Sequence, residues 1–120
     1  MELIIKKCLK CGATVEVLKD CMCDNCGIRC CNEPMVELEP NIGEEVDSHL
    51  PSYEIKNNEI IVKLDHALED NHHIEWILLI TKNEMYKKCL TSNTVNFPYV
   101  KESKLYVYCN KHGLYSVDIM

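Results

Sequence analysis

Residues 104–119 read Lys104-Leu105-Tyr106-Val107-Tyr108-Cys109-Asn110-Lys111-His112-Gly113-Leu114-Tyr115-Ser116-Val117-Asp118-Ile119. The runs 104–110 and 114–119 are rich in β-branched and aromatic residues and have the length of strands. The short connection between them contains Gly113, so the chain leaves one strand and turns back into the next. This stretch therefore predicts two neighbouring antiparallel strands, with a thiol and an imidazole, Cys109 and His112, where the chain turns.

Similar runs occur earlier in the chain. Residues 60–64, 74–81 and 85–90 are again β-branched or aromatic, and residues 56–59 and 82–84 carry turn chemistry between them. No stretch shows a long apolar period of 3.6 residues, so we expect helices to be scarce. Several short strands at regular spacing predict an all-β fold, an antiparallel β-sandwich.

The cysteines are distributed unevenly. Seven of the nine lie within residues 1–38, where Val15 and Val17 suggest one short strand. A segment this short buries too little apolar area to fold alone, so we expect a metal to supply much of its stability. The sequence is acidic over 37–47 and contains Pro40 and Gly43, as in a linker. We therefore predict two domains, a cysteine metal module at 1–38 and a β-sandwich at 39–120.

Composition limits the partners and the compartment. The net charge is −6, and there is no basic stripe or aromatic-rich RNA motif, so we expect no nucleic-acid partner. The longest apolar run, Trp76 to Ile80, is too short to span a bilayer, and residues 1–7 lack the features of a secretory signal. We therefore expect no membrane segment and a cytoplasmic location. An odd number of cysteines in a reducing compartment favours metal ligands over a disulfide framework.

Five residues in three segments form a candidate ligand set: His49, His66, His72, Cys109 and His112. Each histidine alone would be read as a surface or core residue, and Cys109 with His112 could be a nucleophile with its base. No third residue that would orient such a pair stands out. Imidazole suits iron, copper and zinc, whereas a single thiolate among nitrogens favours a redox metal. The set also exceeds the four ligands that zinc normally takes. It therefore predicts one shared redox-metal site.

The segments that carry these ligands are His49-Leu50-Pro51, residues 66–76 and residues 108–114. In order and spacing they resemble the active site of the superoxide reductases. Cys8-x-x-Cys11 and the adjacent Cys30-Cys31 resemble the additional iron site of the desulfoferrodoxin branch of that family. The resemblance covers nearly the whole chain. It implies an immunoglobulin-like sandwich, a homodimer and a rubredoxin-like electron donor.

The resemblance also implies the chemistry. It places a mononuclear non-haem iron among four histidines that lie in a plane, with Cys109 on one axis and the opposite position open for superoxide. The local positive charge of the metal attracts the anionic substrate, and the thiolate favours transfer of one electron. The implied reaction converts superoxide, one electron and two protons to hydrogen peroxide, without release of oxygen.

Two residues near the ligands receive other roles. Strand alternation puts His72, Ile74 and Trp76 on one face, and His73 and Ile77 on the other. His73 stands where the family usually has a tyrosine, so we expect it to lie near the site without binding the metal. We expect Trp76 to pack beside the metal and shield it.

The chain departs from the family pattern just before the first histidine. Most members have a Glu-Lys pair there, and this chain has Asp47 and Ser48. Asp47 is a candidate to approach the metal as the glutamate does, although it is one methylene shorter. Ser48 lacks the mobile positive charge of lysine, so we expect slower capture of superoxide and a weaker salt dependence.

Two sets of four cysteines are candidate ligands of the cysteine site. We favour the set that matches the family: Cys8, Cys11, Cys30 and Cys31. However, Cys23-x-x-Cys26 is a second metal knuckle. A zinc-ribbon or rubredoxin-like site could therefore use the other set: Cys8, Cys11, Cys23 and Cys26. Tetrahedral thiolate suits iron and zinc alike, so the site relays electrons if it holds iron and is structural if it holds zinc.

The remaining cysteines have several possible roles. If the first set binds the metal, Cys21, Cys23 and Cys26 are free thiols, a second small metal site or a redox pair on a loop. We expect Cys89 to be a buried apolar residue in a strand.

Two rival functions use the same residues. One is an iron protein that dismutates superoxide or consumes peroxide. The other is a non-enzymatic iron electron carrier or redox sensor, which the additional cysteines and Ser48 would suit. Oxygen release identifies the first, and a site that binds neither azide nor cyanide identifies the second.

Overall fold

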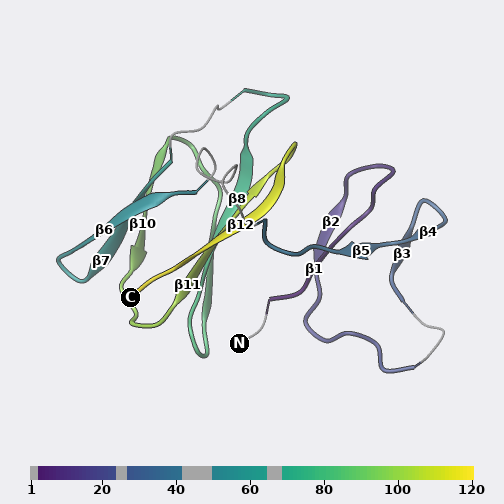
Figure 1. Cartoon of the computed structure of the whole chain (residues 1–120), viewed down its shortest axis with the longest axis horizontal. Helices are drawn as coiled ribbons and strands as arrows, with labels where there is room; N and C mark the ends of the chain where they lie inside the picture. The colour runs from purple at the N-terminus through teal and green to yellow at the C-terminus, as the bar shows by residue number, and fades with distance from the viewer. Residues whose placement is uncertain (1–2, 24–26, 42–49, 65–68) are drawn as a thin grey trace. The chain divides into compact units, whose positions relative to one another are not determined.

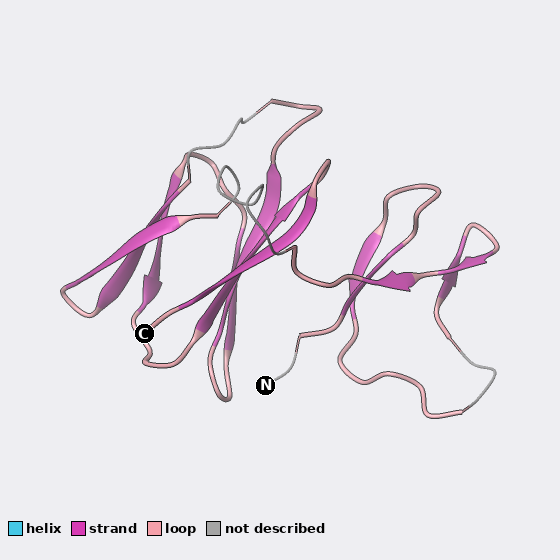
Figure 2. Ribbon diagram, in the orientation of Figure 1, coloured by secondary structure: helices cyan, strands magenta, loops and turns pink. Residues whose placement is uncertain are grey.

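Figure 1 shows the computed structural model of the chain, in which residues 3–23, 27–41, 50–64 and 69–120 are described. The regular structure of these residues consists of strands without any helix (Figure 2). In particular, this part of the chain has no helix long and apolar enough to cross a membrane. The chain divides into two compact units, residues 2–39 and residues 40–120. The all-β fold class expected from the sequence is confirmed.

The larger unit contains two antiparallel sheets. The first has the strand order β10-β7-β6 and consists of β6 (Ser52–Lys56), β7 (Glu59–Lys63) and β10 (Thr94–Pro98). The second has the order β12-β11-β8-β9 and consists of β8 (Ile74–Ile80), β9 (Met85–Lys88), β11 (Lys104–Cys109) and β12 (Gly113–Asp118). One buried cluster draws residues from both sheets, among them Ile60, Val62, Phe97, Ile77, Leu105 and Val107. The sheets therefore pack face to face as a sandwich.

Strands β11 and β12 form the hairpin expected from residues 104–119. Their register runs from Lys104 opposite Asp118 to Cys109 opposite Gly113. Along β11, Leu105, Val107 and Cys109 alternate into the core. This alternation brings the Cys109 side chain to the buried end of the strand, where it is 0% exposed.

Strand β8 does not keep the simple alternation expected from its sequence. Ile74 and Ile77 both belong to the core, although three positions separate them. Trp76 pairs with Tyr108 and Ile74 pairs with Cys109, so the register shifts and Glu75 is the additional residue of a β-bulge. The prediction that Ile74 lies on the opposite face from Ile77 is therefore wrong. The bulge lies directly beside Cys109.

The smaller unit is built from short strands. A three-stranded antiparallel sheet has the order β2-β1-β5, with β1 (Ile5–Lys7), β2 (Thr14–Glu16) and β5 (Val36–Glu37). Strands β3 (Arg29–Cys30) and β4 (Glu33–Pro34) form a separate hairpin. Among the described residues 3–39, the buried apolar side chains are Ile5, Cys8 and Val17. This core is far smaller than that of the sandwich.

Candidate metal centres

Four cysteines of the smaller unit lie together: Cys8, Cys11, Cys30 and Cys31. Their sulfur atoms are all within 4.8 Å of one another. Cys8 and Cys11 belong to a tight turn in which the N–H of Gly12 donates to the carbonyl of Cys8, at 2.9 Å. Gly12 has a φ of +84°, a conformation that glycine adopts without strain. The turn brings two thiols of the Cys-x-x-Cys motif to one side of the chain.

The other two cysteines are presented by the β3–β4 hairpin. Its turn residues, Cys31 and Asn32, have φ values of +54° and +63°. Positive φ at both central residues is typical of a two-residue type I′ turn. Cys30 ends β3 and Cys31 begins this turn, so the two adjacent thiols reach the same point in space. Their sulfur atoms lie 3.9 Å apart.

The thiols influence one another's ionisation. The backbone N–H of Cys11 donates to Cys8 Sγ at 3.5 Å and is the main cause that lowers the pKa of Cys8 to about 7. The Cys11 thiol, whose sulfur is 3.7 Å from Cys30 Sγ, is the main cause that raises the pKa of Cys30 to about 12. The pKa of Cys31 is raised as well, again chiefly by Cys11. One thiol therefore ionises readily, and further negative charge in the cluster is opposed unless a cation compensates it.

The sulfur spacing fits a tetrahedral metal ion. Metal–sulfur bonds of about 2.3 Å in a tetrahedron place the sulfur atoms about 3.8 Å apart. The distances are 3.7 Å between Cys11 and Cys30 and 3.9 Å between Cys30 and Cys31. Four thiols at this spacing could hold iron or zinc.

The remaining cysteines lie elsewhere. Cys23 is an exposed thiol and belongs to neither cluster of the described residues, whereas Cys21 is disulfide-bonded and thus not a free thiol. Cys26 lies outside the described residues. Cys89 is exposed and follows the end of β9, so the expectation of a buried strand residue is wrong. The expectation rested on its apolar character, but the chain has already left the sheet at this position.

A second cluster lies in the sandwich and consists of His72, Cys109 and His112. A ring nitrogen of each histidine and the cysteine sulfur lie within 4.8 Å of one another. His72 is half-buried in the segment before β8, Cys109 ends β11 and is buried, and His112 is exposed in the β11–β12 turn. Two segments that are distant in sequence thus converge at one end of the sandwich.

The geometry of this cluster suits a shared metal ion. Cys109 Sγ lies 3.6 Å from His112 Nδ1. One metal can bridge this distance, because metal–nitrogen and metal–sulfur bonds of about 2.1 and 2.3 Å together span up to about 4.4 Å. The rings of His72 and His112 lie edge to face, with centroids 5.0 Å apart and planes at 78°. This cluster therefore combines imidazole nitrogen with one buried thiol.

Asn41 and Gly113 shape the turn that carries His112. Asn41 Nδ2 donates to the His112 carbonyl at 2.8 Å, and the Asn41 N–H donates to the Leu114 carbonyl at 2.7 Å. Gly113 has a φ of +96°, and a Cβ added there would lie 3.2 Å from Asn41 Nδ2. Asn41 could not be found from the sequence, because 71 residues separate it from His112.

The other proposed site residues have different outcomes. His49, His66, Asp47 and Ser48 lie outside the described residues. His73 is not part of the cluster; its Nδ1 is 2.9 Å from the Glu69 carbonyl and its Nε2 is 3.9 Å from Glu75 Oε1. The Trp76 ring stacks on Tyr108, with centroids 5.2 Å apart and planes at 16°. Trp76 thus packs against the residue that precedes Cys109.

Comparisons with known proteins place the chain in one family. Residues 40–118 match the family model described as desulfoferrodoxin. The desulfoferrodoxin of Syntrophotalea carbinolica is 35% identical, with 98% of this chain and 97% of the relative covered. A desulfoferrodoxin homolog of Methanothermobacter thermautotrophicus is 37% identical, with 92% of this chain and 94% of the relative covered.

A solved structure has the same fold. The superoxide reductase of Treponema pallidum superposes with a TM-score of 0.72 at 21% sequence identity, with 97% of this chain and 98% of that chain covered. The fold, the sulfur cluster and the histidine–cysteine cluster thus accompany sequence similarity along nearly the whole chain. This chain belongs to the desulfoferrodoxin family.

Proposed function

We propose that this chain is a superoxide reductase, which reduces superoxide by one electron to hydrogen peroxide without releasing oxygen. The observation that carries the proposal is the convergence of His72, Cys109 and His112, whose ligand atoms lie within 4.8 Å in a chain of this family. His49 and His66 complete the proposed set of four histidines and one cysteine. Asp47 is the proposed carboxylate that approaches the site.

The proposed site is suited to iron. His72, Cys109 and His112 would hold the iron, which would supply one-electron redox chemistry between an external donor and superoxide. Cys109 is 0% exposed, which protects its sulfur from solvent and from side reactions. His112 is exposed, so solvent protons can reach this side of the cluster. The two protons that peroxide formation requires can therefore come from water.

The sulfur cluster of the smaller unit is the proposed second metal site. Cys8, Cys11, Cys30 and Cys31 would hold iron, as an electron relay, or zinc, as a structural ion. The further proposals are a rubredoxin-like electron donor, a homodimer and a cytoplasmic location. Metal analysis of the purified chain separates the two metals: two irons per chain indicate a relay, and one iron with one zinc indicates a structural site.

The activity is tested by product analysis. The reduced chain is mixed with superoxide, and peroxide and oxygen are measured together. Reduction yields about one peroxide per superoxide and no oxygen, whereas dismutation yields half as much peroxide with an equal amount of oxygen. Cys109→Ala is expected to abolish the reaction. Cys89→Ala is the matched control, because Cys89 is an exposed thiol outside both clusters.

The outcomes distinguish the rivals. Oxygen release would replace this proposal with a dismutase. Failure to form peroxide, together with an oxidised site that binds neither azide nor cyanide, would replace it with an electron carrier or redox sensor.

A further inference from the structure

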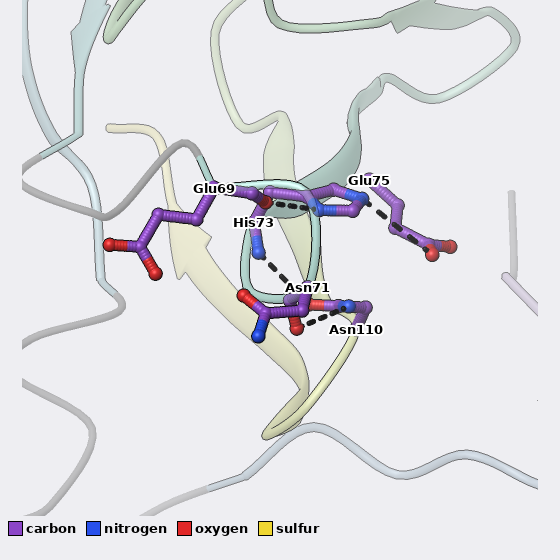
Figure 3. Close-up of polar contacts among 5 residues, drawn as sticks. All are labelled: Glu69, Asn71, His73, Glu75 and Asn110. Atoms are coloured by element: carbon purple, nitrogen blue, oxygen red, sulfur yellow. Dashed lines mark hydrogen bonds and ion pairs between the residues drawn. The ribbon is translucent and has the colours of Figure 1, made fainter.

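Asn110 joins the two segments that carry the histidine–cysteine cluster (Figure 3). The backbone N–H of His73 donates to Asn110 Oδ1 at 2.9 Å, and Asn110 Nδ2 donates to the carbonyl of Asn71 at 3.1 Å. The backbone N–H of Asn110 also donates to the carbonyl of His73, at 3.1 Å. These three hydrogen bonds connect Asn110 to the residues on both sides of His72.

Asn110 lies between two candidate ligands in the sequence, so its contacts connect them to a third. It directly follows Cys109 and lies two residues before His112. A residue bonded covalently to one candidate ligand thus holds the backbone around another. Asn110 is half-buried. Its hydrogen bond with the His73 N–H is partly buried and so partly shielded from water, whereas its hydrogen bond to the Asn71 carbonyl is exposed.

The segment that Asn110 grips is itself a closed turn. The N–H of Glu69 donates to the His72 carbonyl at 3.0 Å, and the N–H of His72 donates to the Glu69 carbonyl at 3.1 Å. The same Glu69 carbonyl lies 2.9 Å from His73 Nδ1. Figure 3 draws this contact as a dashed line. Three contacts therefore tie residues 69–73 together. Fixing Asn71 and His73 fixes the position of His72 as well.

We propose that Asn110 is a positioning residue, which sets the separation between His72 and the Cys109–His112 pair and so tunes the metal held there. This inference rests on the proposed function of the cluster as a metal centre. Groups that orient metal ligands commonly change metal affinity by about 10–100-fold when they are removed. An asparagine that merely stabilised a surface turn would lower the melting temperature without changing the metal's own spectrum.

The test uses the iron-loaded full chain. Asn110→Ala removes both side-chain hydrogen bonds and leaves the backbone bond to His73. Asn110→Asp keeps an acceptor for the His73 N–H and loses the donor to Asn71. Iron loss to a competing chelator is measured, together with the thiolate-to-iron absorption band of the oxidised protein. The iron or zinc of the four-cysteine cluster serves as an internal reference, because Asn110 belongs to the other unit.

Asn41→Ala is the matched control. This substitution removes one side-chain hydrogen bond to the β11–β12 turn, at the His112 carbonyl. It leaves the hydrogen bonds of Asn110 to Asn71 and His73 in place. We expect Asn110→Ala to weaken iron retention by about 10–100-fold and to shift the absorption band. Asn110→Asp should lie between Asn110→Ala and the wild type, and Asn41→Ala should lose less than Asn110→Ala.

Each contrary result has one meaning. If Asn110→Ala retains iron as the wild type does and its thiolate-to-iron band is unchanged, this inference is wrong and the proposed function stands. The same conclusion follows if Asn41→Ala loses as much iron as Asn110→Ala. If the wild-type chain holds no iron at the histidine–cysteine cluster, the proposed function fails, and this inference fails with it.

Discussion

Gly113 follows His112 and has a left-handed backbone conformation. Its φ of +96° is unfavourable for a residue with a Cβ, and the added carbon would lie 3.2 Å from Asn41 Nδ2. We expect Gly113→Ala to lower the free energy of unfolding by about 1–2 kcal/mol, since left-handed conformations cost an L-residue about that much. Iron should also be lost more readily from the histidine–cysteine cluster, because His112 is the preceding residue. Denaturant unfolding and chelator competition measure the two effects.

Gly12→Ala is the reciprocal control for this change. Gly12 also has a positive φ, of +84°, but an added Cβ would meet nothing within 4 Å. It follows Cys11, so its substitution should weaken the four-cysteine cluster and leave the histidine–cysteine cluster unaffected. If Gly113→Ala and Gly12→Ala impaired both clusters equally, the local explanation would be wrong.

The ionisation of the four thiols predicts how metal binding depends on pH. A metal needs thiolates, so protons compete with it and affinity falls as pH falls. Cys30, with a pKa of about 12 in the metal-free cluster, must release its proton on binding throughout the neutral range. Cys8, with a pKa of about 7, must do so only below that pH. The slope of log affinity against pH should therefore steepen by about one proton as the pH drops below about 7.

Zinc or cobalt competition with a chelator at several pH values measures this slope. Cys8→Ser is the useful comparison, since its weakened cluster should no longer show the change of slope near pH 7. A constant slope in the wild-type chain would contradict the assignment of the low pKa to Cys8.

Ser48 provides a prediction that follows from the sequence alone. A lysine at this position would add a positive charge near the proposed open coordination position. We expect Ser48→Lys to speed the capture of superoxide and to make its rate fall more strongly with added salt. Stopped-flow or pulse-radiolysis measurements at two ionic strengths test this, with Ser48→Gln as a control of similar length without charge. Equal rates for the two variants would dismiss the role of charge.

At the scale of strands, the sequence predicts those elements that have a clear period or a β-branched and aromatic composition. Runs 60–64, 74–81, 85–90, 104–110 and 114–119 correspond to β7, β8, β9, β11 and β12, and no end differs by more than two residues. Strand β6 was not predicted, because its five residues, Ser52–Lys56, contain only two apolar positions and no β-branched run. Tyr53 packs on the core, whereas Ile55 is 44% exposed. The strands of the smaller unit have two or three residues, too few to show a period, and β2 was predicted from its β-branched residues alone. The bulge in β8 depends on its partner β11, so no single-strand pattern contains it.

Strand β10 was also missed, although its contribution to the core is large. Phe97 is 1% exposed and packs in the cluster that both sheets share. We expect Phe97→Ala to lower the free energy of unfolding by about 3–5 kcal/mol, through lost burial and the cavity left behind. Asn96→Ala, at the exposed neighbouring position, should change it by less than about 0.5 kcal/mol. Urea unfolding of both variants decides the matter, and a small effect at Phe97 would mean that β10 is not part of the stable core.

At the scale of the whole molecule, the two units depend on different forces. The sandwich has a continuous apolar core drawn from both sheets. The described part of the smaller unit buries few apolar side chains and leaves several exposed: Leu9, Leu18, Met22, Ile28 and Val36. The sequence anticipated this contrast, because cysteines dominate one segment and β-branched residues the other. Composition alone left Cys23 and Cys26 as rivals of Cys30 and Cys31, and the family resemblance favoured the second pair. The Cys31-Asn32 turn brings the sulfurs of Cys30 and Cys31 within 4.8 Å of those of Cys8 and Cys11.

Metal removal tests this division directly. Because four thiols replace a hydrophobic core in the smaller unit, a chelator that strips the metal should unfold its strands. The sandwich should stay folded, because its apolar core does not depend on the metal. Amide hydrogen exchange resolves the two units: the N–H groups of Val17 and Leu38, which donate to Ile4 and Ile5, should lose protection, while those of β11 keep it. Restoring zinc should restore protection at Val17 and Leu38, and protection that survived the chelator would show that the smaller unit folds without its metal.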